Sequence, residues 1–573
     1  MKNKILLSGL ASAMFLGCMT SCDDDYLSTS PITNIGESTA VSSTKAAQMS
    51  VYGIARIMYS QLSTTYPRGC NGEATYTQYV NEVLSPDNVS YFHMGECGRL
   101  WYTWQSITDK NNSRNDAFWD YCYMIIGRAN TILATIDAAE GTEAERQWIT
   151  AQALTYRAHG YLHALQWFGP RWQDSQNGEA YAVILRTEPG TGPAPLGTMN
   201  QILDLIYDDC KKAVDLYNQS GSQRDEIWQP DIEIAYGTLA RAALLKNDWA
   251  TARSAAKSAR EGYPIASNDD YMGGFIEATS DCMWTNWDND IYYSSFGSWF
   301  SCNGAYACNW SRGYGINIDF YRKLDPNDIR RQCFFTPDKA AEVAKIAGYE
   351  DVASFTEADF YNGNNTTVST VDCVAGGLAK LAKGFVQYSI NNNPMIRYAT
   401  SYPYCPVAGG VSSKDPSSMQ FGAAVKMWSN GNNGTYCDSK YPWMRATEML
   451  LTEAEAAYMS GDQTAAANLL SELNSMRIPG YTAPSGDALL EDIRLTRRIE
   501  LWGEGQTWLD FKRWNLPAEK REFKENDVTS GNCPATYASN IAATACNGWR
   551  LTIPQGESDF NPAFDRTLLN YKE

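Results

Sequence analysis

The sequence predicts a mainly α-helical protein in which two regions of paired helices flank a long irregular segment. Apolar residues recur every three or four positions toward both ends of the chain, and short turns separate the resulting stretches in pairs. This spacing places the apolar side chains on one face of a helix. The pattern mostly fails between Tyr263 and Tyr441, where Gly, Asn, Ser and aromatic residues dominate. With 573 residues the chain can bury a large core.

The first residues have the composition of an export signal. Lys2 and Lys4 precede a short apolar stretch, Ile5 to Leu16. A helix needs about 20 apolar residues to span a bilayer, so this stretch is too short to do so. We therefore predict a signal peptide at residues 1–21.

Cys22 is the predicted site of lipidation. Ser21 precedes it, and a small residue before a cysteine is the pattern that lipoprotein signal peptidase cleaves. The acidic run 23–25 that follows resembles the surface-export signal of Bacteroidetes lipoproteins. Cys18 is a rival site, and an ordinary cleaved signal is the alternative. Each buried CH₂ of an acyl chain contributes about 0.8 kcal/mol, so several chains anchor a protein almost permanently.

Composition narrows the classes of function. The net charge of -18 argues against nucleic acid as a partner, because phosphates require clustered Lys and Arg. The 15 cysteines form no CxxC pair, so a zinc ribbon is not indicated. Cys302 with Cys308, and Cys533 with Cys546, are close enough in sequence to form disulfides, but spacing alone does not establish a bond. Aromatic residues make up 12% of the chain, including 18 Trp and 35 Tyr.

The N-terminal helices can be placed from their apolar spacing. We predict helices over Asn115–Asp137, Glu143–Trp167, Met199–Leu216, Ile232–Lys246 and Trp249–Arg260. The second ends at Phe168-Gly169-Pro170, which cannot continue a helix. The last two form a pair around the turn Asn247-Asp248, and alanines on one face let them approach closely, as in tetratricopeptide hairpins.

The same arrangement returns near the C-terminus. Predicted helices cover Met444–Met459, Thr464–Met476 and Asp487–Trp502, and Ser460-Gly461-Asp462 forms the turn between the first two. The consensus tetratricopeptide signature is absent, so periodicity alone favours a generic helical bundle equally. We divide the chain into the signal peptide 1–21, an N-terminal helical region 22–262, a loop-rich insert 263–440 and a C-terminal helical region 441–573.

The insert is the predicted location of a ligand site, because irregular segments on a rigid scaffold concentrate binding residues. Only Pro337 to Gly348 within it has a helical pattern. Sugar rings offer an apolar C–H face and a rim of hydroxyls, which flat aromatic rings and polar side chains can recognise together. Two aromatic-rich regions without helical periodicity fit this role. Their candidate ligand-binding residues are Trp101, Trp104, Trp284, Trp287, Tyr292, Trp299 and Trp310.

Other groups of polar residues give weaker indications of a functional site. His159 and His163 are four residues apart on a helix, but no Glu follows His159 as in the zinc-protease motif, so we interpret them as frame residues. The run 288–290 (Asp-Asn-Asp) lacks the distal Glu of an EF-hand loop. Glu500 and Glu504 have Arg and Lys neighbours that would keep both ionised and unsuited to donating a proton. We predict no catalytic residue, no metal and no cofactor.

Several ordered blocks of the sequence resemble the SusD/RagB family of outer-membrane lipoproteins. The matching blocks are Trp119 to Asn130, Ala151 to Gly169, Arg445 to Glu455, Arg497 to Gly505, Trp508 to Trp514, Ile553-Pro554 with Glu557, and Asn561-Pro562. Gln506 stands where the family often has Arg.

The resemblance implies a frame of four tetratricopeptide-like hairpins whose irregular loops carry the ligand site. It implies a lipid-anchored, surface-exposed protein of the outer membrane that captures a glycan and passes it to a SusC-type TonB-dependent transporter, without covalent chemistry. Two alternatives remain open: a peptide cargo, as in the RagB branch, and a surface glycoside hydrolase, whose carboxylate pair cannot be recognised from sequence.

Overall fold

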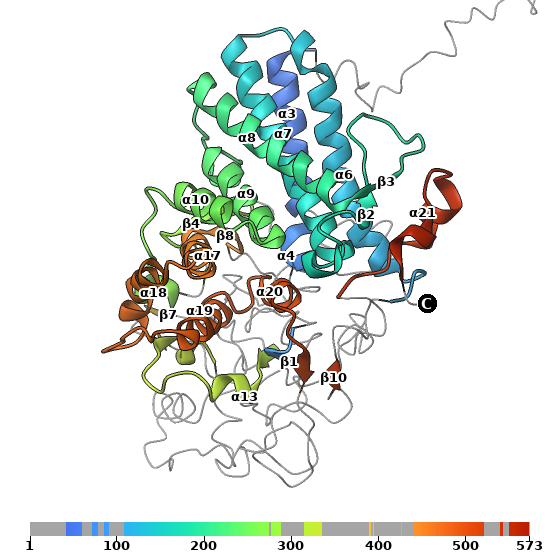
Figure 1. Cartoon of the computed structure of the whole chain (residues 1–573). Coiled ribbons are helices and arrows are strands. Elements are labelled where there is room, and N and C mark those ends of the chain that lie inside the picture. Colours follow the sequence, from blue (N-terminus) through green and yellow to red (C-terminus); the bar gives the residue numbers. More distant parts are fainter. Residues whose placement is uncertain are drawn as a thin grey trace, which may run out of the picture.

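The computed structural model describes residues 42–59, 72–77, 85–90, 108–273, 275, 277–287, 314–334, 389–390, 393–394, 426, 440–520, 539–541 and 549–571. Within these residues helices predominate and the strands occur in pairs, which confirms the predicted mainly α fold (Figure 1). None of the helices in these ranges combines the length and apolar character that a membrane crossing needs.

Four long helices form a bundle at one end of the molecule (Figure 1). They are α3 (Thr44–Tyr59), α6 (Ser113–Thr135), α7 (Glu143–Phe168) and α8 (Met199–Ser220). Helix α7 packs against the other three, and from Ala151 to Phe168 every side chain except Arg157 is buried. The predicted helices over 115–137, 143–167 and 199–216 are confirmed. The sequence analysis placed no helix at α3.

Local sequence explains where the central helices begin. The Thr142 hydroxyl accepts a hydrogen bond from the Glu145 N–H at 3.2 Å, and the Glu145 carboxylate accepts one from the Thr142 N–H at 2.8 Å. Thr198 and Gln201 form the same reciprocal pair at the start of α8. Each capping box satisfies backbone N–H groups that the first turn of a helix leaves without partners.

The two predicted hairpins lie side by side although they are far apart in sequence. Helices α9 (Ile232–Lys246) and α10 (Trp249–Ala259) form one pair, and α17 (Ala446–Met459) and α18 (Gln463–Arg477) form the other. Helix α10 packs against both α9 and α17, and α19 (Asp487–Glu500) packs against α17 and α18. A Cβ on Gly237 of α9 would lie 2.2 Å from Met444 Sδ, so this glycine permits a close approach. All five predicted helices are confirmed.

Short strands connect segments that are distant in sequence. Strand β4 (Cys282–Thr285) pairs antiparallel with β8 (Pro442–Arg445). The two ends of the segment between these strands therefore lie next to each other at the helical frame. The other antiparallel pairs are β1 (Asn88–Ser90) with β5 (Tyr314–Ile316), β2 (Tyr181–Ile184) with β3 (Leu196–Thr198), β6 (Ser389–Ile390) with β7 (Asn393–Pro394), and β9 (Ala518–Lys520) with β10 (Ser539–Ile541).

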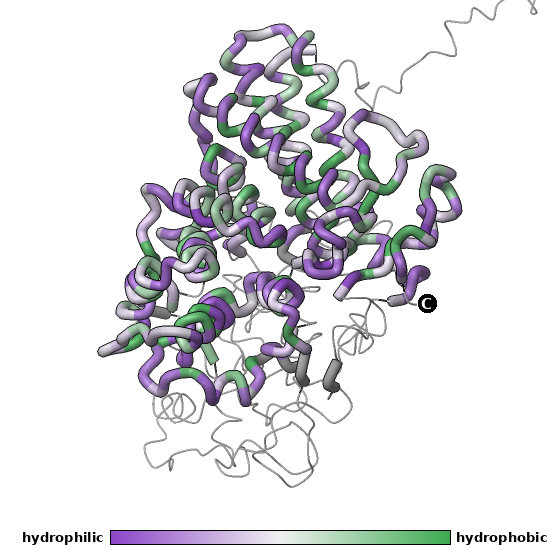
Figure 2. Tube along the Cα trace, in the orientation of Figure 1, coloured by the Kyte–Doolittle hydropathy of each residue, from purple (hydrophilic) through white to green (hydrophobic). Residues whose placement is uncertain are grey.

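Shorter helical elements complete the described structure. They are α4 (Gly72–Thr77), η3 (Ile136–Ala138), η4 (Trp172–Asp174), α11 (Asn268–Tyr271), α13 (Ile318–Tyr321), η6 (Ile329–Cys333), α20 (Thr507–Trp514), α21 (Gln555–Phe560) and η9 (Arg566–Leu569). The stretch with a helical pattern, Pro337 to Gly348, lies outside the described residues. Figure 2 shows hydrophilic and hydrophobic positions alternating along the helices, as expected of helices that bury one face.

Buried ion pairs join the C-terminal helices to one another and to the rest of the frame. Arg497 of α19 contacts Asp510 of α20 at 2.7 Å, and Arg513 contacts Glu455 of α17 at 2.5 Å. Arg498 donates to Asp87, next to β1, at 2.7 Å. These charged residues of the C-terminal motif therefore pair between elements, because the chain turns between α19 and α20.

The four described cysteines form no disulfide bond. Cys122, Cys210, Cys282 and Cys333 are free and buried. The two bridges considered from the sequence, Cys302 with Cys308 and Cys533 with Cys546, lie outside the described residues.

Candidate functional site

Trp284 lies in the core, so its prediction as a ligand-binding residue is wrong. Its side chain is 0% exposed, and its indole N–H donates to the Trp228 carbonyl at 2.9 Å. Its ring packs edge-on against His159 and Trp443, with centroid distances of 5.0 and 5.2 Å. All four residues of β4 are buried, because the strand pairs with β8 and packs against the helical frame. An aromatic-rich composition could not distinguish this strand from an exposed loop.

Trp287 has a different environment. It is partly exposed and stacks on Trp228, with ring centroids 4.3 Å apart and planes inclined by 2°. Tyr52 of α3 meets the same Trp228 edge-on at 5.1 Å. The Trp287 ring is thus stacked on the Trp228 ring, two residues after the end of β4. Sequence reasoning missed Trp228, which stands alone before α9 and outside both aromatic-rich regions.

The remaining predicted site residues cannot be placed in the same way. Trp101, Trp104, Tyr292, Trp299 and Trp310 lie outside the described residues, as does the predicted lipidation site Cys22 with its rival Cys18. The acidic run 288–290 also falls there.

The carboxylates Glu500 and Glu504 are bound to cations. Glu500 lies 3.2 Å from Arg477 and 3.3 Å from Arg330, and is fully buried. Burial raises its pKa, but the nearby guanidiniums lower it by more, so the pKa is held well below the usual range. Glu504 contacts Arg445 at 2.8 Å and Lys426 at 2.6 Å. Held ionised in this way, Glu500 is unsuited to general acid catalysis, and Glu504 is engaged by two cationic side chains.

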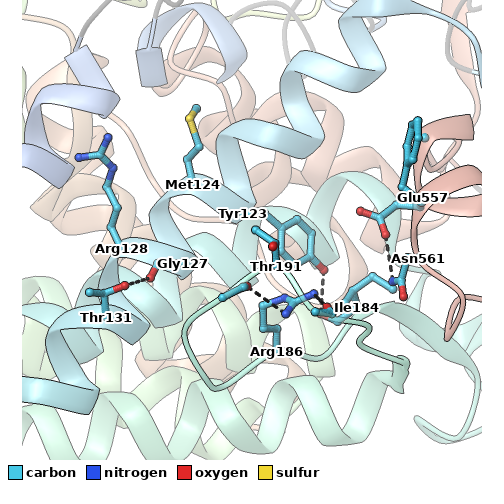
Figure 3. Close-up of a pocket in the computed structure, with 14 residues that line it drawn as sticks. Tyr123, Met124, Gly127, Arg128, Thr131, Ile184, Arg186, Thr191, Glu557 and Asn561 are labelled. Carbon is cyan, nitrogen blue, oxygen red and sulfur yellow. Dashed lines mark hydrogen bonds between the residues drawn. The ribbon is translucent and has the colours of Figure 1, made fainter. Parts of the chain in front are cut away.

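A pocket of about 500 Å³ opens between α6, α21 and the connection from β2 to β3 (Figure 3). Figure 3 shows Arg128 and Thr131 of α6 on one side and Glu557 and Asn561 on the other, with Tyr123 between them. At its edge Phe560 is 87% exposed, the most exposed large apolar side chain among the described residues.

Hydrogen bonds fix the wall of this pocket. The Tyr123 hydroxyl donates to the Ile184 carbonyl at 2.7 Å. The Arg186 guanidinium donates to the Gly190 carbonyl at 3.0 Å and also to the Gly192 carbonyl, which closes the turn after β2. Rings and polar groups on rigid backbone are suited to holding a small polar ligand.

Two motif residues of the sequence analysis have structural partners here. Glu557 accepts hydrogen bonds from the Trp119 indole N–H at 2.8 Å and from the Asn561 amide at 3.1 Å. The same Asn561 amide donates to the Ala194 carbonyl at 2.9 Å. Burial, and then the charge of Glu557, raise the pKa of neighbouring Asp120 to about 6. The motif therefore ties the C-terminal segment to α6 and to the connection from β2 to β3.

The helical scaffold and the partly exposed Trp287 ring define a class of protein. In this class a frame of paired helices carries an aromatic-rich segment that is joined to the frame at both ends. Comparison with known proteins then identifies the family. A model described as "SusD family" matches residues 243–568, and one described as "Starch-binding associating with outer membrane" matches residues 42–244. The chain belongs to the SusD family, which confirms the resemblance inferred from the sequence blocks.

Individual relatives are distant but cover most of the chain. A SusD-like protein of Bacteroides ovatus is 22% identical over 549 residues, which are 90% of this chain and 83% of the relative. A SusD-like carbohydrate binding protein from Bacteroides vulgatus has a TM-score of 0.66 at 18% identity, covering 93% of this chain and 99% of the other. A second structure from Bacteroides vulgatus, described as a putative sugar binding protein, has a TM-score of 0.65 at 19% identity, with 92% and 98% covered. These likenesses establish the SusD fold.

Proposed function

We propose that the chain is a non-catalytic glycan-binding lipoprotein that captures an oligo- or polysaccharide at the cell surface and delivers it to a SusC-type TonB-dependent transporter. The observation that carries the proposal is the pair of family matches, which together span residues 42–568 and include one described as starch-binding and outer-membrane associated. Membrane attachment through a lipid on Cys22 is part of the proposal and rests on the sequence pattern around that residue.

The proposed grip on the glycan starts at Trp287. Its ring is partly exposed and supported from behind by Trp228, and a supported ring loses little conformational freedom when a sugar stacks on it. The chain continues from Trp287 directly into the segment that contains Tyr292, Trp299 and Trp310. As in the sequence analysis, we propose that these residues contribute to glycan binding together with Trp101 and Trp104. Trp284 has no part in it.

A binding assay tests the glycan proposal. The full-length protein is titrated with a panel of soluble polysaccharides by isothermal calorimetry, and the best ligand is then measured with Trp287→Ala. A buried or stacked Trp at a binding surface typically contributes more than about 1.4 kcal/mol, so the affinity should fall at least about tenfold. No binding to any polysaccharide, or an unchanged affinity in Trp287→Ala, would contradict the proposed grip.

The pocket beside α21 is a second candidate binding site, because it combines an exposed ring with polar groups. Phe560→Ala in the same assay separates the two sites. If the site at Trp287 binds the glycan, this variant keeps the wild-type affinity while Trp287→Ala loses it. The opposite result assigns binding to the pocket.

The remaining alternatives need other assays. New reducing ends after incubation with the bound polysaccharide would indicate a glycoside hydrolase, and tight binding of a peptide mixture without glycan binding would indicate a RagB-like cargo. Transporter delivery predicts that the tagged protein co-purifies with a TonB-dependent transporter from outer membranes of its own host. Absence of such a partner would refute that part of the proposal alone.

A further inference from the structure

Three side chains that commonly bind metal ions meet inside the frame. His159 and His163 lie one turn apart on α7, and Glu73 of α4 faces both. Glu73 Oε1 is 2.5 Å from His163 Nε2 and 3.3 Å from His159 Nε2. The three side chains offer ligand atoms that all lie within 4.8 Å of one another. Their exposed fractions are between 0 and 3%.

The hydrogen bond of His163 fixes which of its nitrogens is free. Its Nδ1 lies 3.1 Å from the side-chain oxygen of Gln166. A carbonyl oxygen only accepts, so Nδ1 carries a hydrogen and donates it. The lone pair of Nε2 then faces a carboxylate oxygen at 2.5 Å. Two acceptors at that distance require a positive charge between them, which is either a proton or a metal ion. Donation from Nδ1 to an outer partner is also the usual arrangement of a metal-bound imidazole.

His159 supplies an independent observation. It is fully buried; its Nδ1 has no hydrogen-bond partner, and its Nε2 has only the 3.3 Å approach of the Glu73 carboxylate, without hydrogen-bond geometry. A buried polar group without a partner is costly, typically by about 1–3 kcal/mol. The His159 Nε2 points at the Glu73 carboxylate 3.3 Å away, so a cation shared by the two side chains would give both a partner.

We propose that Glu73, His159 and His163 bind a divalent first-row metal ion such as zinc. Two histidines at i and i+4 on one helix, completed by a carboxylate, form a recurrent zinc-binding set. Ligand atoms about 2.0–2.1 Å from a tetrahedral zinc ion lie roughly 3.3 Å apart, which is the separation of Glu73 and His159 in the structure. The contact between Glu73 and His163 has to open by less than 1 Å, roughly, to admit the ion.

The surroundings hold the three ligands in place. The Tyr121 hydroxyl donates to the other oxygen of Glu73 and orients the carboxylate. A Cβ on Gly505 would lie 2.7 Å from Thr77 Cβ, so α4 also packs closely against the C-terminal motif. The ion would fasten the six-residue helix α4 to α7, the central helix of the bundle. Both histidines are buried in the frame, as interpreted from the sequence; Glu73 could not be associated with them there, because it lies 90 residues before His163.

Metal content of the full-length protein tests the proposal. The protein is unfolded with a chelator, refolded with one equivalent of zinc, dialysed, and measured by inductively coupled plasma mass spectrometry. We expect about one zinc ion per chain. His159→Phe and His163→Phe keep a ring in each position, and their zinc content per chain should be at least about tenfold lower than that of the wild type. His93→Ala removes the third histidine of the chain and is the control, which should retain the ion.

Two results would overturn the proposal. One is wild-type protein that refolds but retains less than a tenth of an equivalent of zinc, which leaves a shared proton between Glu73 and His163. The other is an equal metal content in the His159→Phe, His163→Phe and His93→Ala proteins, which places the ion elsewhere. If the phenylalanine variants do not fold, wild-type protein is refolded with cobalt and its visible spectrum is recorded. The spectrum of a four-coordinate cobalt ion with nitrogen and oxygen ligands supports the proposed site. The spectrum of the hydrated cobalt ion refutes it.

Discussion

Replacing Glu500 by Gln should destabilise the frame strongly, although the two side chains have nearly the same shape. Glu500 is the last residue of α19 and is 0% exposed. It lies within 3.2 to 3.6 Å of three guanidiniums, those of Arg477, Arg330 and Arg445, which are 0 or 1% exposed. The substitution removes the negative charge and leaves these cations with less compensation inside the protein.

The expected cost follows from this burial. Breaking a buried ion pair by removing one partner typically costs 3–5 kcal/mol, because an uncompensated charge remains. Gln keeps one hydrogen-bond acceptor, and Arg330 and Arg445 keep other carboxylates, Asp328 and Asp281, at 2.8 Å. We therefore expect the lower end, about 3 kcal/mol, which is a change of more than about 100-fold in the unfolding equilibrium.

Urea denaturation followed by circular dichroism measures this difference. Glu491→Gln on the same helix is the matched control, because Glu491 pairs with Arg494 at 3.0 Å but its side chain is 71% exposed. Exposed pairs contribute about 0–1 kcal/mol, so this variant should be close to wild type. A loss below about 1 kcal/mol for Glu500→Gln, equal to that of the control, would refute the assigned role of the buried network.

The pH dependence gives a second readout. The folded-state pKa of Glu500 is depressed, so its contribution to stability is fully present above the unfolded-state pKa of about 4.3 and is lost as pH falls toward the folded-state pKa. The difference between wild type and Glu500→Gln should therefore be constant above about pH 5 and shrink below about pH 4. A difference that grows on acidification would contradict this assignment.

Three further predictions use single substitutions. Asp120→Asn should stabilise the protein by about 1–3 kcal/mol at pH 7.5 and by little at pH 4 in urea melts, because burial and Glu557 raise the folded-state pKa to about 6 and the ionised form is disfavoured above it. Trp284→Ala should cost about 3–5 kcal/mol as a core truncation, whereas Trp287→Ala should cost less than half as much in the same denaturation assay. Thr142→Ala should cost about 1 kcal/mol through loss of the cap of α7, and Thr142→Ser should restore most of it.

The helices were predictable because their signals are local. Each predicted helix has an uninterrupted apolar stripe, a cap or breaker at its ends, or both, and these features need no knowledge of the rest of the chain. Helix α3 has the same signal, since Ala47, Val51, Ile54 and Met58 are buried at helical spacing, and could have been found.

The site was less predictable because composition does not report burial. Trp284 and Trp287 stand three residues apart in one aromatic-rich run, yet one is sealed in the core and the other is partly exposed. Pairing between β4 and β8 decides which is which, and that pairing joins residues about 160 positions apart. The pocket beside α21 and the Glu73–histidine cluster likewise combine distant segments, and no single stretch of sequence carries either signal.

The buried acids have a role that connects the frame to the proposed site. Arg445, at the end of β8, contacts Asp281 just before β4 and Glu504 after α19. Lys426, from within the predicted insert, donates to the carbonyls of Glu500 and Trp502 at 2.8 and 2.9 Å as well as to Glu504. Glu504, which could suggest catalysis from the sequence alone, is therefore part of an ion-pair network. This network holds the insert against the helices near its start at Asp281, near its end at Arg445, and at Lys426 between them. Ligand affinity should consequently fall in Glu504→Gln, although Glu504 is buried in the frame, and the protein should also lose stability. In Trp287→Ala the affinity should fall with a smaller loss of stability, because this ring is partly exposed.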